Sequence, residues 1–485
     1  MINLLKLAFI IPAYFLIGPL LGMLIARSRK AQRVVFCLMV IMPSLPIGKL
    51  TLMVDSIETY RGHTKGFEAN WIEVLGLALI TASVLNRTRR PGWRSLAPGT
   101  VVYIAWCVLS MLSVMQASDK ILALMAAFKF MKAVIIFLAA FHFLRDENDL
   151  SWVLRTMSFG QIFYALLALK MRYMDGLWQI RGWFEHQNPM AMWSYMTGIP
   201  LLAAALYRNT SSKDAALYFA GFSGSVLCIL LTVSRAGFGA LAFGASLVLL
   251  LSWLRSPSTR NLYATVACVI GVVGISAFAM DSFRARLQEI TRTSEAHEFD
   301  LRATLNKQTA AMLRDSAIGI GWNNLGVMNS RPNGNKYSAI LEEWDRSRGF
   351  RINDKNYYAN PLTESLYWLL LAETGYPGFI GFMLFIGFTL WHSIRCAWRF
   401  RDSFCGAFAG AQFVTLGICY MHGTVERILT QTKNMSFWLL MCGLIAAMEA
   451  VRQREARTLS SIKPKLTKRR ALTGPMPVNI TPATL

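Results

Sequence analysis

One carboxylate in this sequence stands where chemistry at a membrane surface could take place. Glu364 precedes an apolar run, and Asn360 and Pro361 before it are residues typical of a helix start. Glu364 and Trp368 would then share one face of a short helix that ends at Gly375. A carboxylate held there could act as a general base. The alternative is a solvated first turn, where its negative charge suits the helix dipole.

The composition places this carboxylate in an integral membrane protein. The 485-residue chain is 54% apolar, and runs of 18 or more mostly apolar residues recur along it, each long enough to cross a bilayer. A formal net charge of +23 is typical of cytoplasmic loops and lipid contact in such proteins, so we expect no nucleic-acid partner. The eight cysteines fall in apolar runs or beside basic loops, and we expect buried thiols without disulfides.

The apolar runs predict an all-α polytopic fold with twelve or thirteen transmembrane helices. The thirteen spans are 4–26, 33–54, 70–86, 99–117, 121–144, 150–170, 189–207, 215–233, 236–254, 261–281, 377–394, 403–422 and 434–451. The chain would then divide into four parts. These are ten spans within residues 1–281, a large outer loop with short helices at 282–376, three spans within 377–451 and a disordered basic tail at 452–485.

The charges of the connectors orient these spans. Strongly basic connectors belong in the cytoplasm by the positive-inside rule, and weakly basic ones alternate with them. The inward set comprises 27–33, 87–94, 395–401 and the tail, together with the weaker connectors 145–149, 208–214 and 255–260. The outward set comprises 55–69, 171–188, 234–235, 282–362 and 423–433. We therefore expect the N-terminus outside and the C-terminus inside.

Four segments on the outward side together resemble the O-antigen ligase and polymerase superfamily of bacterial envelope glycosyltransferases. That superfamily carries a G-x-F-x-H-x-N step, an S-R-A-G turn and a long periplasmic loop. The loop contains an Arg, a G-x-G segment and an L-L-A-E-T-G run. Here these features read Gly182–Asn188, Ser234–Gly237, Arg302, Gly319–Gly321 and Leu370–Gly375. The resemblance covers about residues 100–450 and depends on the order, spacing and shared side of the motifs, because each motif is short.

The resemblance implies a GT-C-like glycosyltransferase of the bacterial inner membrane with its active site facing the periplasm. Such an enzyme transfers a glycan from undecaprenyl diphosphate to an acceptor hydroxyl and uses no metal and no nucleotide sugar. The sequence has no clustered metal ligands and no Gly-rich phosphate loop, so we expect no cofactor. The lipid-linked donor, the glycan acceptor and the bilayer would be its partners, with a chain-length regulator and a flippase as further candidates.

In such a reaction, side chains must neutralise the diphosphate, and arginine does this best through its planar fork of donors. Arg235 and Arg302 match the arginine positions of the family, and Arg181 is a looser match. His186 could contact sugar or shuttle protons. Asn188 of the same motif is also expected among the substrate-binding residues. The alternatives are interfacial snorkelling for Arg235, a solvated loop helix for Arg302 and a helix cap for His186.

The sequence departs from the family pattern at the position where the ligases of the family have a histidine. Ligases that attach O-antigen to lipid A core place a His ahead of the L-A-E-T-G segment, whereas this chain has Glu364 there. We assign the general base to Glu364, and the replacement favours a repeat-unit polymerase. Glu373 matches the Glu of the family and is placed among the binding residues, although Thr374 and Gly375 beside it indicate a structural role.

Two lysines lie deep inside one predicted span. Lys129 and Lys132 are three residues apart, so they share a helix face, and charges at that depth usually face a cavity or a partner. Binding of a diphosphate or a lipid head is the functional interpretation. The alternative is that the span starts later and both lysines snorkel to the interface.

The sequence thus favours a polymerase of lipid-linked exopolysaccharide or O-antigen repeat units. An O-antigen ligase is the alternative within the same class. A transporter or flippase of lipid-linked glycan would show internal repeats with paired broken helices, and none is visible. A pure scaffold protein would not need arginines gathered on one side of the membrane.

Overall fold

The computed structural model describes residues 10–46, 49–52, 62–64, 66–87, 96–270, 295–329, 336–347 and 362–472. Within these residues nearly all regular structure is helical, and the one sheet has two strands. Seven of the described helices are long and apolar enough to cross a membrane, which confirms an all-α polytopic membrane protein. They are α6 (Lys120–Phe143), α7 (Glu147–Tyr173), α9 (Ser212–Thr232), α10 (Arg235–Arg255), α15 (Leu366–Arg399), α16 (Phe404–His422) and α17 (Thr432–Leu472).

Further helices complete the bundle. The helices are α2 (Gly18–Ile25), preceded by the π-helical turn η1 (Ala13–Ile17), α3 (Arg29–Ile41), α4 (Trp71–Leu85), α5 (Thr100–Met111), continued by the 3-10 turn η4 (Leu112–Gln116), and α8 (Gln187–Leu206). Of these, the apolar stretches Ile10–Ile25, Trp71–Leu85 and Thr100–Gln116 are shorter than a full membrane span. The span predicted at 261–281 lies only partly within the described residues.

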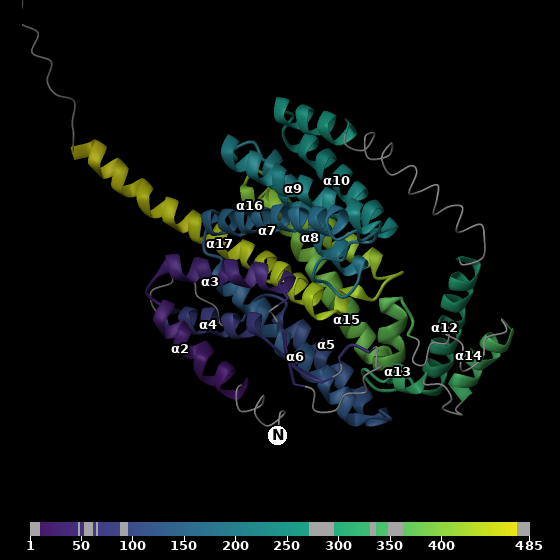
Figure 1. The fold of residues 1–485 in the computed structure, drawn as a ribbon. Helices are drawn as coiled ribbons and strands as arrows, with labels where there is room; N and C mark the ends of the chain where they lie inside the picture. The colour runs from purple at the N-terminus through teal and green to yellow at the C-terminus, as the bar shows by residue number, and fades with distance from the viewer. Residues whose placement is uncertain are drawn as a thin grey trace, which may run out of the picture.

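The helices pack as two groups that meet along α15, α16 and α17 (Figure 1). In one group, α8 packs against α9, α10 and α16, and α9 also packs against α7. In the other, α15 packs against α5, α17 against α6, and α4 between α2 and α6. Helix α8 is buried along its whole length from Pro189 to Leu206, so it forms the centre of the first group.

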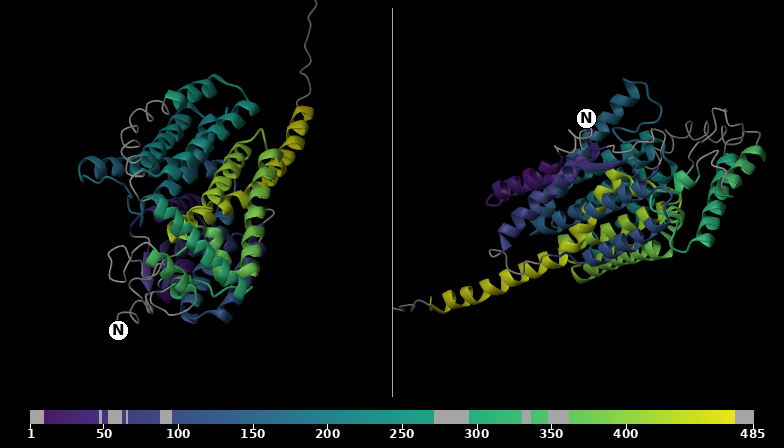
Figure 2. Two further views of the ribbon diagram at one scale, coloured as in Figure 1. Left: turned by 90° about the vertical axis from the view of Figure 1, so that its right-hand side faces the viewer. Right: turned by 90° about the horizontal axis from the view of Figure 1, so that it is seen from below.

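The helices of the long polar loop lie at one end of the bundle. They are α12 (Glu295–Asp315), α13 (Leu325–Met328) and α14 (Lys336–Ser347). The C-terminal part of α17 leaves the bundle at the opposite end, as both views show (Figures 1 and 2). The loop and the tail, which the charge pattern assigns to opposite sides of the membrane, therefore lie at opposite ends of the molecule.

The span predicted at 33–54 is wrong in its second half. Helix α3 ends at Ile41 and passes into the 3-10 turn η2 (Met42–Ser44). Residues Lys49–Leu52 form strand β1, which pairs antiparallel with β2 (Phe67–Asn70). Proline occupies positions 43 and 46, where a helix would need backbone N–H groups, so the helix cannot continue.

Helix α15 begins after Glu364 and not before it. Its N-cap is Ser365 and its first residue is Leu366. The Leu366 backbone N–H donates to the Gly423 carbonyl at 2.8 Å, a contact between distant segments that fixes where the helix starts. The prediction that Glu364 and Trp368 share a helix face is therefore wrong. The predicted N-cap and first residue at 360–361 lie outside the described residues.

The predicted break at Gly375 is confirmed. Its φ of 61° and ψ of −166° are not helical, so α15 consists of two helical pieces that meet at a kink. These angles fall in a region that side chains with a Cβ rarely adopt. A Cβ on Gly375 would also come within 2.3 Å of the Ala317 carbonyl oxygen and 2.5 Å of the Gly319 nitrogen. The kink thus has both a conformational and a packing requirement for glycine.

We predict that Gly375→Ala destabilises the protein by at least about 2 kcal/mol, because the positive φ and the backbone collision both oppose a methyl group. The measurement is the Tm of the purified protein in detergent. Gly387→Ala in the same helix is the matched control, since its Cβ would meet nothing within 4 Å and alanine favours a helix interior. Equal Tm values for the two variants would contradict the role given to the kink.

Candidate functional site

The G-x-G segment of the long loop docks on the kink of α15. Gly319, Gly321 and Gly375 all have positive φ, and a Cβ on Gly319 would lie 2.5 Å from the Glu373 carbonyl oxygen. The two backbones therefore approach as closely as only glycines permit. Three backbone hydrogen bonds join them: Ile320 to Ala372 at 2.9 Å, Gly321 to Glu373 at 3.1 Å and Tyr376 to Ala317 at 2.9 Å. We call residues 317–325 the anchor segment.

The Glu373 side chain completes this contact from inside the protein. It is fully buried, and its carboxylate accepts hydrogen bonds from the backbone N–H groups of Asn323 (2.9 Å) and Leu325 (3.2 Å). The His63 ring nitrogen Nε2 lies 3.0 Å from the same carboxylate. The structure therefore places Glu373 beneath the anchor segment, where it holds backbone groups of the loop.

The two lysines of α6 are buried in the same interior region. The Lys132 Nζ lies 2.7 Å from the Glu73 carboxylate of α4. The Lys129 Nζ donates to the His63 carbonyl at 2.7 Å. Helix α6 begins at Lys120, and both lysine side chains are buried within the protein. Lys132 thus has a buried carboxylate as its partner, and Lys129 has a backbone carbonyl.

The two residues that the sequence singles out most strongly contact each other. The Arg302 guanidinium of α12 forms an ion pair with the Glu364 carboxylate, and each side chain is about 40% exposed. One helical turn further along α12, Asn306 accepts a hydrogen bond from the Thr363 hydroxyl at 3.0 Å. One face of α12 therefore holds the segment before α15 and leaves the ion pair open to solvent.

A second carboxylate lies near this ion pair, on the connector between α16 and α17. The Asn188 side-chain amide donates to the Glu426 carboxylate at 2.7 Å, and the Ser234 hydroxyl donates to the Asn188 carbonyl oxygen at 3.0 Å. Ser234 is the N-cap of α10 and accepts from the Gly237 N–H. Asn188 thus joins the first and second motifs directly and also holds Glu426.

The electrostatic environment of Glu426 differs from that of an exposed carboxylate. Burial raises the pKa of Glu426 to about 7, and the negative charge of Glu364 acts in the same direction. Arg302, the Asn188 amide and Arg427 lower it but do not cancel the effect. A group with this pKa can gain and lose a proton near neutral pH.

The remaining predicted residues surround this pair of carboxylates on the same end of the bundle. His186 is the N-cap residue of α8, although its side chain makes no cap hydrogen bond. Burial lowers the pKa of His186, Glu364 opposes this shift and Arg181 adds to it, so the three side chains are electrostatic neighbours. Arg235 is exposed at the first residue of α10.

The turn that presents Arg235 is strained. Val233, which caps α9, has a φ of 56°, and a β-branched residue seldom adopts this left-handed conformation. The turn allows Ser234 to cap α10 immediately after α9 ends. Strained backbone of this kind persists where the surrounding structure fixes it, and it is common at functional sites.

The structure thus brings together Glu364, Arg302, Arg181, His186 and Asn188, with Arg235 at the same end. It places Glu373, Lys129 and Lys132 in the interior. Sequence reasoning missed Glu426, because a single Glu in a short connector has no spacing signal. Its outward connector at 423–433 and the flanking Arg427 were the available indications.

Among the described residues, no group of three or more His, Cys, Asp or Glu side chains is placed to hold a metal ion. All eight cysteines lie in described residues and are free thiols, six of them buried.

A family model matches the part of the chain that contains most of these motifs. Residues 220–383 match the family model described as O-antigen ligase. The matched range contains the S-R-A-G turn, Arg302, the G-x-G segment and the kink, and the Gly182–Asn188 motif precedes it. The match supports the place of this chain in the O-antigen ligase and polymerase superfamily. A search of curated proteins gives no match.

The raised pKa of Glu426 predicts a pH-dependent stability. The folded protein holds this proton more tightly than the unfolded chain, whose carboxyl has its usual pKa of 4.5. The contribution to stability is therefore fully present below pH 4.5 and is lost as the pH rises through about 7. We predict that Glu426→Gln removes about 2–3 kcal/mol of this pH dependence between pH 5 and 8.

The measurement is the Tm of the wild type and the variant across this pH range. The exposed carboxylate variant Glu343→Gln on α14 is the control and should follow the wild type. Parallel Tm curves for the wild type and Glu426→Gln would contradict the buried environment described for Glu426.

Proposed function

We propose that this member of the O-antigen ligase and polymerase superfamily is a glycosyltransferase of the bacterial inner membrane. It polymerises undecaprenyl-diphosphate-linked repeat units of an exopolysaccharide or O-antigen on the periplasmic face. The observation that carries the proposal is the Arg302–Glu364 ion pair, because it holds the carboxylate that we assign as base beside an arginine that we assign to the diphosphate. Both residues lie within the matched range, at the end of the bundle that carries the outward connectors.

In the proposed step, an acceptor hydroxyl attacks the anomeric carbon of the donor glycan. The bond between that carbon and the diphosphate oxygen breaks, and undecaprenyl diphosphate leaves with the bonding electrons. Glu364 takes the proton of the attacking hydroxyl as general base. Its position just before α15, held by Thr363 and Arg302, gives the carboxylate a fixed location at the surface of the site.

The leaving diphosphate requires positive charge, and this chain supplies it with arginine. The Arg302 guanidinium has five N–H donors in a planar fork, so it can contact Glu364 and a phosphate oxygen together. Arg235 at the start of α10 and Arg181 before α8 are assigned to the same diphosphate and the first sugar. His186 and Asn188 complete the set, and no metal is needed in this assignment.

Glu426 is assigned a supporting role. With a pKa of about 7, its carboxyl group is partly protonated at neutral pH. It can therefore donate a hydrogen bond to a sugar or accept the proton that Glu364 has taken. Its contact with Asn188 also fixes the side chain that links the first two motifs.

A ligase is the second candidate, and one observation favours it. The matched family model is described as O-antigen ligase, and His186 gives the site a histidine next to Glu364. Glu364 at the position where ligases have a His favours the polymerase. The two reactions share the donor and the leaving group, and they differ only in the hydroxyl that attacks.

The experiment uses purified full-length protein in liposomes with undecaprenyl-diphosphate-linked repeat units and excess chelator. The polymerase proposal predicts a ladder of longer lipid-linked glycans, with one undecaprenyl diphosphate released for each linkage formed. A ligase would leave the donor length unchanged and transfer glycan only when lipid A core is added. Absence of both products, or activity that returns only with Mg²⁺ or Mn²⁺, would contradict the proposal.

Glu364→Gln tests the general base. We predict a loss of about 10²–10⁴-fold in the rate of transfer with unchanged binding of the lipid-linked donor, because glutamine keeps the size but cannot take a proton. Glu343→Gln on α14 is the matched control and should transfer at the wild-type rate. An active Glu364→Gln together with an inactive Glu426→Gln would move the base to Glu426.

Arg302→Ala and Arg235→Ala test the diphosphate contacts. A charged hydrogen bond contributes roughly 1.5–3 kcal/mol, so we predict at least a 10- to 100-fold loss of transfer for each variant. Arg302→Lys should also fail substantially, because lysine lacks the planar fork. Arg314→Ala, on the same helix and exposed, is the control. Normal polymer from both alanine variants would count against a shared diphosphate site.

A further inference from the structure

A cavity lies at the end of the bundle opposite the Arg302–Glu364 pair. It lies between the C-terminal ends of α8 and α10 and the start of α16 and is partly open to solvent. Its wall contains three arginines, Arg208, Arg255 and Arg401, and one acidic residue, Asp402. The connectors at this end belong to the set that the charge pattern assigns to the cytoplasm.

Arg255 is held in place before any ligand arrives. Its guanidinium donates to the Gly406 carbonyl at 3.1 Å and to the Ala397 carbonyl at 3.3 Å. It lies directly over Gly410 of α16, where an added Cβ would come within 3.0 Å of Nη2. Two of its five N–H donors are used in these bonds, so donors remain for a ligand in the cavity.

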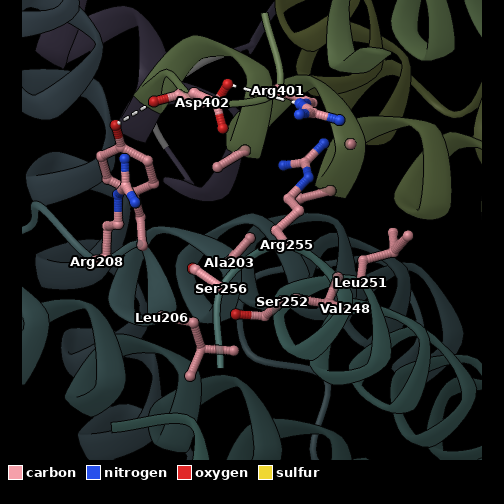
Figure 3. Close-up of a pocket in the computed structure, with 14 residues that line it drawn as sticks. Ala203, Leu206, Arg208, Val248, Leu251, Ser252, Arg255, Ser256, Arg401 and Asp402 are labelled. Atoms are coloured by element: carbon pink, nitrogen blue, oxygen red, sulfur yellow. Dashed lines mark hydrogen bonds and ion pairs between the residues drawn. The ribbon is translucent and has the colours of Figure 1, made fainter. Parts of the chain in front are cut away.

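Arg401 approaches the same space from the connector before α16. Figure 3 shows the guanidinium groups of Arg255 and Arg401 directed toward one another across the cavity. The Arg401 side chain is 75% exposed, and its Nε lies 3.6 Å from the Asp402 carboxylate. Two facing cations repel, and an anionic group between them would be attracted by both. The three arginines outweigh Asp402, so the cavity has a net positive charge.

Part of the remaining wall is apolar, beside the polar side chains of Tyr207, Ser252 and Ser256, and it borders α10. Ala203, Leu206, Val248 and Leu251 line the cavity beside the arginines. Helix α10 is the least buried of the seven described candidate spans, because only 28% of its most apolar stretch is buried inside the protein. Its residues Leu250 and Leu254 are 54% and 73% exposed near the cavity end of the helix. An acyl chain could therefore continue from the cavity along this surface.

We propose that this cavity binds the phosphate of an anionic phospholipid headgroup, with Arg255 and Arg401 on the phosphate and the acyl chains along α10. Basic pockets between helices on the cytoplasmic side are suited to such headgroups, because the inner leaflet carries anionic lipid. This site is separate from the proposed glycan transfer and does not depend on it.

The test measures the Tm and the lipid affinity of the purified full-length protein in detergent. The probes are short-chain phosphatidylglycerol, short-chain phosphatidylcholine and inorganic phosphate. Phosphatidylglycerol should raise the Tm of the wild type more than the other two. Arg255→Gln and Arg401→Gln should each weaken its binding about tenfold or more. Lys213→Ala, which removes an exposed cation at the same end but outside the cavity, should bind normally.

Arg401→Gln keeps the test valid if Arg255→Gln disturbs the fold, because the exposed Arg401 side chain supports no buried contact in the structure. An equal response to phosphatidylcholine, or equal binding by Arg401→Gln and the wild type, would overturn the proposal. Equal protection by inorganic phosphate would show that the ligand is a free anion and that the lipid assignment is wrong.

Discussion

The contact between the anchor segment and the kink of α15 positions the long loop on the helical bundle. It consists of backbone hydrogen bonds between residues 317–321 and 372–376, with glycines where the two chains approach most closely. Beneath it, the buried Glu373 carboxylate accepts from two loop amides, and charged hydrogen bonds of this kind contribute roughly 1.5–3 kcal/mol each. Glu373 therefore acts on the site through the backbone that it holds.

The candidate site follows from this contact. Helix α12 directly precedes the anchor segment, so docking of the segment brings Arg302 and Asn306 against residues 363–364. The start of α15 is tied in turn to the α16–α17 connector by the bond from Leu366 to Gly423, which brings Glu426 to the same place. Two carboxylates of different environment thus meet at one end of the bundle: Glu364 is open to solvent and paired with arginine, and Glu426 is mostly buried.

The sequence predicted the helical membrane fold and the break at Gly375, because these depend on local patterns. Arg302 and Glu364 were singled out with the help of the family resemblance, and their pairing was not predicted. The sequence could not predict the start of α15, since the Leu366–Gly423 bond overrides the helix-start signal at 360–361. The place of Glu426 in the site could not be predicted from the sequence either, because its environment depends on Asn188, which lies 238 residues away in the chain. The pairing of Lys132 with Glu73 is likewise a contact between separate helices, so sequence reasoning left its role open.

The most direct test of this account is the location of the bound lipid diphosphate. A photoreactive analogue of undecaprenyl diphosphate should crosslink to peptides that contain residues 181–188, 234–237, 302–306 or 423–433, and Arg302→Ala should reduce this labelling. Labelling confined to the cavity around Arg255 at the other end of the bundle, or labelling that Arg302→Ala leaves unchanged, would contradict the account.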